Sequence, residues 1–315
     1  MHERPPDEAL AEPSTETPTE APIAEIAAEA PKDPETAERP VILENPWRAL
    51  RRFTDARIGL GRVGVSLPTR EWLSFQLDHA RARDAVHLPL DLGRLEADLA
   101  ACARTAALGP PMRLQSPLSG RADYLRRPDL GRTLDAASEA RLDAQAAEGA
   151  RADLALVVVD GLSSVAVQRN AVPFLDALLA ELAAGPERLA LTPPALVSQG
   201  RVAIGDAVGE RLGARAVLVL IGERPGLSSP DSLGLYLTWA PRRGLTDARR
   251  NCVSNVRPGG LGYAEAARRA HYLLREAARL GASGVALKDR SQDAAIEHEG
   301  AAPPLAPLPP GPETP

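Results

Sequence analysis

The sequence predicts an α/β protein with a Rossmann-like, mostly parallel sheet that carries helices on both faces. Residues 154–159 and 216–221 are uninterrupted apolar runs rich in Val and Leu, which is typical of strands buried on both faces. Helical periodicity over 164–183 separates the two runs, and strands that alternate with helices favour a parallel sheet. The chain of 315 residues is 44% hydrophobic and only 3% aromatic, so it can bury a sizeable core made mainly of Leu, Val and Ala.

Composition divides the chain into four parts. Residues 1–44 predict a disordered acidic tail, because twelve acids, many prolines and few large apolar side chains cannot offset the entropy lost on ordering. Residues 45–150 are expected to form an N-terminal helical region and residues 151–288 the Rossmann-like domain, and residues 289–315 predict a second disordered tail. Since the tails hold much of the acid, the net charge of −5 hides a moderately basic body.

Periodicity and capping residues define the N-terminal helical region. Asn45 can cap a helix whose first position is Pro46, and Thr69 can cap the following helix. We expect helices over residues 47–58, 69–86, 90–108 and 134–147, and irregular chain over 109–132. The stretch from Gly59 to Gly64 matches the GxGxxG fingerprint, but a dinucleotide loop must follow a strand and this one follows a helix, so we interpret it as a connector.

The Rossmann-like domain is expected to alternate strands and helices. We expect strands over residues 154–159, 189–191, 195–198, 216–221, 233–239 and 285–287, helices over 164–183, 205–212 and 263–280, and a loop over 241–255. The run 216–221 should lie at the centre of the sheet. The loop Gly222–Gly226 follows it at the carboxyl end, where open parallel sheets bind their ligands.

Three loops should gather polar side chains at this edge of the sheet. The side chains are Asp160, Ser163, Ser164, Glu223, Arg224, Ser228, Ser229, Asn251, Cys252, Ser254 and Asn255. Such a set can orient a large polar ligand, although each member has a structural alternative. Glu223 either contacts a ligand or pairs with an arginine, Cys252 either contacts a ligand or is a packed thiol, and Asp160 is either functional or caps the next helix.

Several classes of protein are disfavoured by what the sequence lacks. It has no GxSxG elbow, GxxxxGK[ST] loop, CxxC pair or HExxH motif, and its five histidines place no base in the ligand loops, so no catalytic residue and no metal ligand is assigned. It has no dense basic run for nucleic acid and no apolar stretch of about 20 residues for a membrane. Two distant cysteines without a signal peptide predict a cytoplasmic protein.

On several long motifs the chain resembles the small subunit of ethanolamine ammonia-lyase, the adenosylcobalamin-dependent enzyme that converts ethanolamine to acetaldehyde and ammonia. The motifs are NPWRALRRFTDARIGLGR (45–62), SLPTREWLSFQLDHARARDAVHLPL (66–90), YLRRPDLGR (124–132), DGLSSVAVQ (160–168), GERPGLSSPDSLGLYLTWAPR (222–242) and RNCVSNVRPGGLGYAEAA (250–267). Together they cover most of residues 45–288.

The resemblance implies a subunit that binds cobalamin through residues 151–288 and presents it to the active site of a heavy subunit in a hetero-oligomer. The cofactor contacts that it carries over fall on Val202, Glu223 and Cys252. Catalytic residues would then belong to the heavy subunit, and the radical chemistry to the cofactor. Because no Asp-x-His-x-x-Gly motif is present, we expect base-on adenosylcobalamin with no cobalt ligand from this chain.

Two points stay open at the level of sequence. One alternative is a nonenzymatic assembly or scaffold protein that keeps the fold and recruits partners through its tails. The other concerns location, since the family enzyme is often enclosed in a bacterial microcompartment, whose shell would then be a further partner. Residues 1–44 are more acidic and less amphipathic than a targeting segment should be, so the chain is placed in the cytoplasm either free or inside such a compartment.

Overall fold

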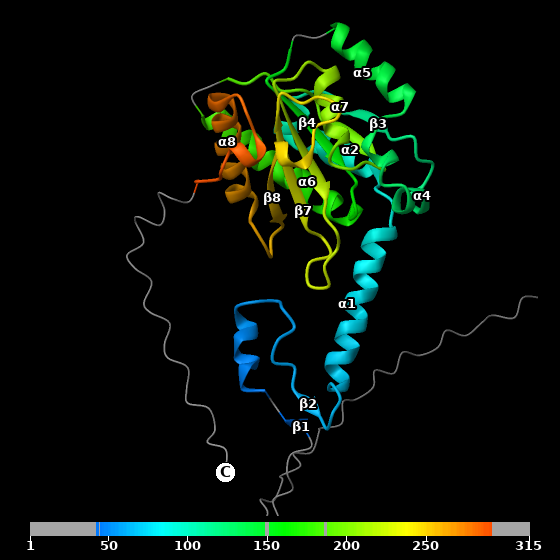
Figure 1. The fold of residues 1–315 in the computed structure, drawn as a ribbon, viewed down its shortest axis with the longest axis vertical. Coiled ribbons are helices and arrows are strands. Elements are labelled where there is room, and N and C mark those ends of the chain that lie inside the picture. Colours follow the sequence, from blue (N-terminus) through cyan, green and yellow to red (C-terminus); the bar gives the residue numbers. More distant parts are fainter. Residues whose placement is uncertain (1–41, 44, 149–150, 186–187, 292–315) are drawn as a thin grey trace, which may run out of the picture.

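The computed structural model describes residues 42–43, 45–148, 151–185 and 188–291. A six-stranded sheet forms the centre of the molecule and carries helices on both faces (Figure 1). Both predicted disordered tails lie almost entirely outside the described residues. Among the described residues, no helix combines the length and the apolar character needed to cross a bilayer.

The sheet has the strand order β3-β5-β4-β6-β7-β8. Its strands are β3 (Met112–Gln115), β4 (Leu154–Val159), β5 (Ala195–Ser198), β6 (Ala216–Gly222), β7 (Leu233–Trp239) and β8 (Arg250–Val256). The first four in spatial order pair in parallel, and β7 and β8 add an antiparallel pair at one edge. The predicted fold class, a mostly parallel α/β sheet, is therefore confirmed, and β6 lies in the interior of the sheet as expected.

Helices connect and cover these strands. They are α1 (Thr69–His87), α2 (Leu92–Ala101), α3 (Ala103–Ala106), α4 (Arg121–Arg126), α5 (Ala136–Glu148), α6 (Ser164–Ala184), α7 (Ile204–Arg211) and α8 (Tyr263–Leu280). Short 3-10 helices cover Pro46–Arg52, Leu130–Arg132, Asp247–Arg249 and Gly284–Ala286. A small separate sheet pairs β1 (Ile42–Leu43) with β2 (Arg62–Val63).

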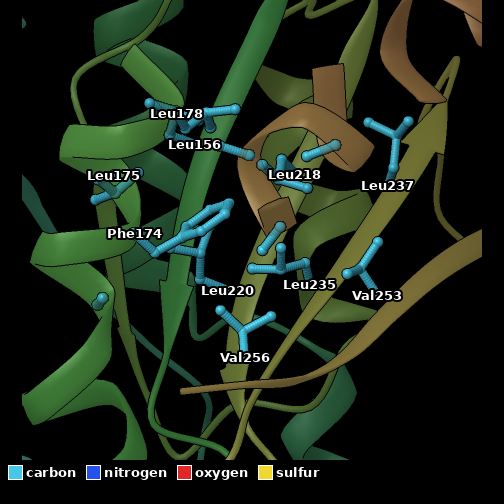
Figure 2. Packing of buried hydrophobic residues seen from close by; sticks show 14 of the residues in the cluster. Leu156, Phe174, Leu175, Leu178, Leu218, Leu220, Leu235, Leu237, Val253 and Val256 are labelled. Atoms are coloured by element: carbon cyan, nitrogen blue, oxygen red, sulfur yellow. The ribbon is translucent and has the colours of Figure 1, made fainter. Parts of the chain in front are cut away.

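Alternating side chains of the central strands build two cores. Leu156 and Leu218 point to the face covered by α2, α6 and α8, whereas Val157 and Val219 point to the face covered by α5 and α7. Figure 2 shows Phe174 of α6 packed among leucines from the strands. Because both faces are covered, β4 and β6 are buried along their whole length, which explains their uninterrupted apolar sequence.

Helix α1 projects away from the sheet, and the chain before it lies at its far end (Figure 1). Only Ala82 and Ala85 of this helix are buried, while Trp72, Leu73 and Leu77 are exposed. The segment before α1 turns back toward the β6–β7 loop, where the Ser228 hydroxyl donates a 3.0 Å hydrogen bond to the Asp55 carbonyl. The apolar side chains of Trp72, Leu73 and Leu77 on α1 therefore do not pack into either core.

Most of the predicted elements are confirmed, but the N-terminal region differs in four places. The helix expected over 47–58 is a 3-10 helix that ends at Arg52, although Asn45 caps it as predicted, accepting from the Trp47 amide at 2.9 Å. Thr69 is the first residue of α1 and makes no side-chain cap. The helix over 90–108 is interrupted at Cys102. The stretch over 109–132, expected to be irregular, contains strand β3 and helix α4, so the predicted helical region contributes an edge strand to the sheet.

Three further differences concern the sheet. The loop expected over 241–255 contains β8, an edge strand whose outward positions are polar and therefore hide the strand pattern. The strand expected over 285–287 is a 3-10 helix with Val285 exposed. The short strand expected over 189–191 is reduced to one bridge at Leu191. The division into domains at residue 150 stays a prediction.

Candidate functional site

The carboxyl ends of β4, β5 and β6 open onto a cavity of about 450 Å³. It is lined by Tyr124, Pro128, Arg132, Leu162, Arg201, Val202, Ala203, Ile221, Gly222, Glu223, Arg224, Tyr236 and Asp247. Two of the three predicted ligand contacts, Val202 and Glu223, therefore face the same hollow. This is the edge of the sheet at which the sequence placed the ligand loops.

Close backbone packing forms one wall of this cavity. The Leu162 amide donates to the Gly222 carbonyl at 2.9 Å, which holds the β4–α6 loop against the end of β6. Gly161 has φ +59, and a Cβ built on it would lie 2.3 Å from the Gly222 carbonyl oxygen. A Cβ on Gly222 would lie 2.0 Å from the Ser163 carbonyl oxygen. Only glycine fits at either position, so both glycines determine the shape of the wall.

Glu223 is held by the antiparallel edge of the sheet. Its carboxylate accepts hydrogen bonds from the Ser232 hydroxyl, from the Ser254 hydroxyl at 2.6 Å and from the Asn255 amide at 3.2 Å. No arginine lies within ion-pair distance of it among the residues that the structure describes, so the predicted alternative of an Arg partner is wrong. The carboxylate is therefore held in place beside the cavity by neutral donors alone.

Cys252 lies one side chain away from the cavity. It is the cross-strand partner of Tyr236 in the pairing of β7 with β8, and Tyr236 is itself part of the lining. Cys252 is exposed, so the alternative of a packed thiol is wrong. Desolvation raises the pKa of Cys252, although the neighbouring Tyr236 opposes the rise, so the group is present as a thiol. The three predicted ligand contacts Val202, Glu223 and Cys252 are thus close to one another, with Cys252 next to the lining residue Tyr236.

Asp160 is buried behind the cavity and ties three segments together. Its carboxylate accepts from the Gln199 amide at 2.8 Å and from the Gly200 amide at 3.1 Å, and Arg121 lies 3.6 Å away. It does not cap α6, because Ser163 does so. Burial raises the pKa of Asp160 to about 6, although these hydrogen bonds and Arg121 oppose the rise. Asp160 therefore has a structural role.

The pKa of Asp160 predicts a pH-dependent stability. Between its ordinary pKa of about 3.9 and the folded value, the native state keeps a proton that the unfolded state has lost, so the free energy of unfolding falls as the pH rises through this window. Between pH 4 and pH 7, the free energy of unfolding of the wild-type chain should fall by up to about 3 kcal/mol relative to that of Asp160→Asn. Urea unfolding at several pH values measures this difference.

Asp129→Asn is a matched control with the opposite sign. Asp129 is exposed, and its hydrogen bond with Arg127 lowers its pKa. The stability that this carboxylate contributes is present above its unfolded pKa and lost as the pH falls, so removing it should not reproduce the trend expected for Asp160. If the difference in stability between the wild-type chain and Asp160→Asn does not change with pH, the assignment is contradicted.

Tyr124 and Arg201 line the cavity, and Arg121 packs against Tyr124 behind it, although the sequence alone assigned none of the three to the site. The guanidinium groups of Arg121 and Arg201 lie over the Tyr124 ring, at 4.6 and 4.1 Å from its centroid. The Tyr124 hydroxyl donates to the Gly200 carbonyl at 3.0 Å, and the Arg201 amide donates to the Gly131 carbonyl at 2.6 Å. These contacts bring α4 and the 3-10 helix after it against the loop that follows β5. The motif YLRRPDLGR (124–132), one of those shared with the family, was the signal in the sequence that pointed to Tyr124.

A second hollow of about 520 Å³ adjoins the first, and both are lined by Arg132, Ala203 and Asp247. Its outer wall is the loop before β8. Arg250 anchors this loop from below, because its guanidinium donates to Asp247 at 2.7 Å, to the Leu245 carbonyl at 3.2 Å and to buried Asp206. The carboxyl edge of the sheet therefore presents one extended, partly open surface.

This surface is suited to binding a large polar group and orienting it. Its lining supplies glycine-shaped walls, a fixed carboxylate and arginines, and the Arg201 Nε and Gln199 Oε1 atoms are buried without partners. Among the described residues there is no cluster of His, Cys, Asp and Glu that could hold a metal ion. The GxGxxG connector contains β2 and lies at the far end of α1, away from this surface.

Comparisons with known proteins identify the family to which this chain belongs. Residues 44–288 match the family model described as "Ethanolamine ammonia-lyase light chain (EutC)". Three similar proteins are named "Ethanolamine ammonia-lyase small subunit". They are from Ralstonia nicotianae (58% identity, 81% of this chain and 93% of the relative), Azotobacter vinelandii (55%, 85% and 97%) and Pseudomonas aeruginosa (56%, 81% and 92%). The match spans the sheet, the cavity and α1, so the chain belongs to the ethanolamine ammonia-lyase light-chain family.

Proposed function

We propose that this chain binds adenosylcobalamin at the carboxyl edge of its sheet and presents it to a heavy subunit that converts ethanolamine to acetaldehyde and ammonia. The observation that carries the proposal is the convergence of Val202 and Glu223 on one cavity, with Cys252 joined to it through Tyr236. When bound, the cofactor supplies the radical chemistry. The residues of this chain bind it, orient it and exclude water from one side.

The size of the cavity supports a shared site. Its volume of about 450 Å³ falls in the range of roughly 300–1,000 Å³ that suits a drug-sized ligand, and a corrin with its nucleotide is larger than that. The chain would thus cover only part of the cofactor, and the heavy subunit would cover the rest. The absence of a suitably spaced Asp-x-His-x-x-Gly motif favours the base-on form.

The exposed apolar residues of α1 support a permanent protein partner. Trp72, Leu73 and Leu77 lie within two turns of the helix, and Phe53 and Val65 are exposed in the segment before it. Contiguous exposed apolar surface of this kind is typical of protein interfaces. We assign this surface to the heavy subunit, in a cytoplasmic complex that is either free or enclosed in a microcompartment.

Co-expression with the heavy subunit tests the proposed function. Acetaldehyde formation from ethanolamine with added adenosylcobalamin should require both chains, and either chain alone should give none. A complex that forms but neither binds cobalamin nor produces acetaldehyde would favour a scaffold protein instead. Activity of the heavy subunit alone would refute the role proposed for this chain.

Replacing Glu223 by alanine should weaken cofactor binding more than it slows turnover. The change removes the acceptor that holds Ser254 and the Asn255 amide, so the β8 side of the site loses its anchor. Charge-assisted hydrogen bonds contribute about 1.5–3 kcal/mol, so the Kd for adenosylcobalamin should rise roughly 10- to 100-fold, with kcat at saturating cofactor changed by less than about twofold. Spectrophotometric titration of the complex and steady-state assays measure the two effects.

Two further variants control this experiment. Glu223→Gln keeps acceptor oxygen and should give an intermediate Kd. Glu276→Ala removes a carboxylate on α8 that is paired with Arg279, outside the cavity, and should leave the Kd unchanged. If Glu223→Ala binds adenosylcobalamin with unchanged affinity, Glu223 is not a cofactor contact.

A further inference from the structure

We infer that Arg201, together with Arg132 and Arg224, forms a subsite for the phosphodiester in the nucleotide tail of the cofactor. All three side chains line the cavity that contains Val202 and Glu223. The inference rests on the proposed function, because it assigns one part of that cofactor to one part of the cavity.

The charges around the cavity carry the first step. Among the described residues, no carboxylate lies within 4.0 Å of any of these three guanidinium groups. Of the two acids in the lining, Asp247 is paired with Arg250 at 2.7 Å, and Glu223 accepts only neutral donors, from Ser232, Ser254 and Asn255. The arginine side of the cavity therefore has positive charge without an internal counterion, which favours an anionic group there.

The fixed position of Arg201 carries the second step. Its guanidinium stacks on Tyr124 and donates to the Tyr124 carbonyl at 3.2 Å, while its Nε is buried without a hydrogen-bond partner. A Cβ on Gly131 would lie 3.0 Å from Arg201 Cγ, so Gly131 leaves room for the side chain. A buried donor without a partner is costly, so the protein itself leaves the donors of this guanidinium only partly satisfied.

The chemistry of the ligand carries the last step. The side chains of the corrin are neutral amides, and the phosphodiester is the anionic group of the cobalamin. Arginine is the side chain best suited to phosphate oxygens, because its planar donors match their geometry. Arg132, Arg201 and Arg224 would therefore hold the phosphodiester of the nucleotide tail.

Cobinamide and cobinamide phosphate test this assignment, because they differ only by the phosphate. In the complex of the full chain with its heavy subunit, we expect tighter binding of cobinamide phosphate. Arg201→Gln should reduce that preference roughly 10- to 100-fold while changing the Kd for cobinamide less than about twofold. Arg132→Gln and Arg224→Gln should each reduce it in the same direction. Since both of these residues are exposed, their loss does not threaten folding.

Arg275→Gln, an exposed change on α8 outside the cavity, is the matched control and should keep the full preference. The readout is the Kd from absorbance titration, which does not depend on turnover. If the arginine variants lose affinity for both compounds equally, or for neither, the phosphate subsite is refuted while the proposed function stands. If the wild-type complex binds no cobalamin at all, both are refuted.

Discussion

Replacing Gly222 by alanine is expected to destabilise the chain by about 4 kcal/mol, one of the two largest effects that we predict. The added Cβ would lie 2.0 Å from the Ser163 carbonyl oxygen, 2.6 Å from the Ser163 carbonyl carbon and 2.8 Å from the Asp160 carbonyl oxygen. All three are backbone atoms, so no side chain can rotate away to relieve the clash. Either β6 or the β4–α6 loop must move.

Such a movement would also disturb what the loop supports. Ser163 caps α6 through the Ala166 amide at 3.1 Å and donates to the Pro230 carbonyl at 2.8 Å. Leu162 and Gly222 both line the cavity, so the same substitution should alter its shape. We expect a lower urea midpoint with an unchanged slope, and weaker cobalamin binding by the complex.

Gly93→Ala provides the matched control. Gly93 lies inside α2, and the nearest atom to its added Cβ would be Asp91 Oδ1 at 3.6 Å, which is ordinary van der Waals contact. Because alanine favours a helix over glycine, this variant should gain about 0.5–1 kcal/mol. If Gly222→Ala were no less stable than Gly93→Ala, the close approach of β6 to the β4–α6 loop would be wrong.

The sequence predicted the centre of the fold better than its edges, for a physical reason. Strands β4 and β6 are covered on both faces, so burial imposes an uninterrupted apolar run that can be recognised without any partner. β3 and β8 each pair with a single neighbour and expose polar side chains, so their sequences look like loops. Their strand character comes from pairing with distant residues, which local pattern cannot report.

Contacts between residues distant in the chain limited the prediction of the site as well. The carboxyl edge of β6 could be predicted from strand position, and Val202, Glu223 and Cys252 were predicted as ligand contacts only through the family resemblance. The stacking of Arg201 on Tyr124 joins residues far apart in the chain, as do the hydrogen bonds of Glu223 with Ser254 and Asn255. Nothing in the spacing of these residues indicates such contacts. The sequence left Glu223 with two alternatives, a ligand or an arginine partner, whereas the fold supplies neutral donors from Ser232, Ser254 and Asn255.

Replacing Arg250 by methionine is expected to cost about 3–5 kcal/mol at pH 7.5. The side chains of Arg250 and Asp206 are each only 2% exposed, and the loss of the guanidinium would leave Asp206 as a buried charge without its cation. Burial already raises the pKa of Asp206 to about 6 even with Arg250 beside it. Without Arg250 this pKa should rise further, so the variant should regain stability relative to wild type as the pH falls toward 5.

The double variant Arg250→Met/Asp206→Leu separates the charge effect from the support of the loop. Apolar residues of similar volume often replace a buried ion pair without loss, so most of the unfolding free energy should return. The hydrogen bonds from Arg250 to Leu245 and Asp247 would still be missing, and these residues line the hollows at the carboxyl edge. Limited trypsin digestion should therefore cut after exposed Arg242, Arg243 or Arg249 faster in the double variant than in wild type at equal stability. Equal cleavage rates would mean that Arg250 serves only to neutralise Asp206, whereas faster cleavage makes it the anchor that holds this wall of the surface in place.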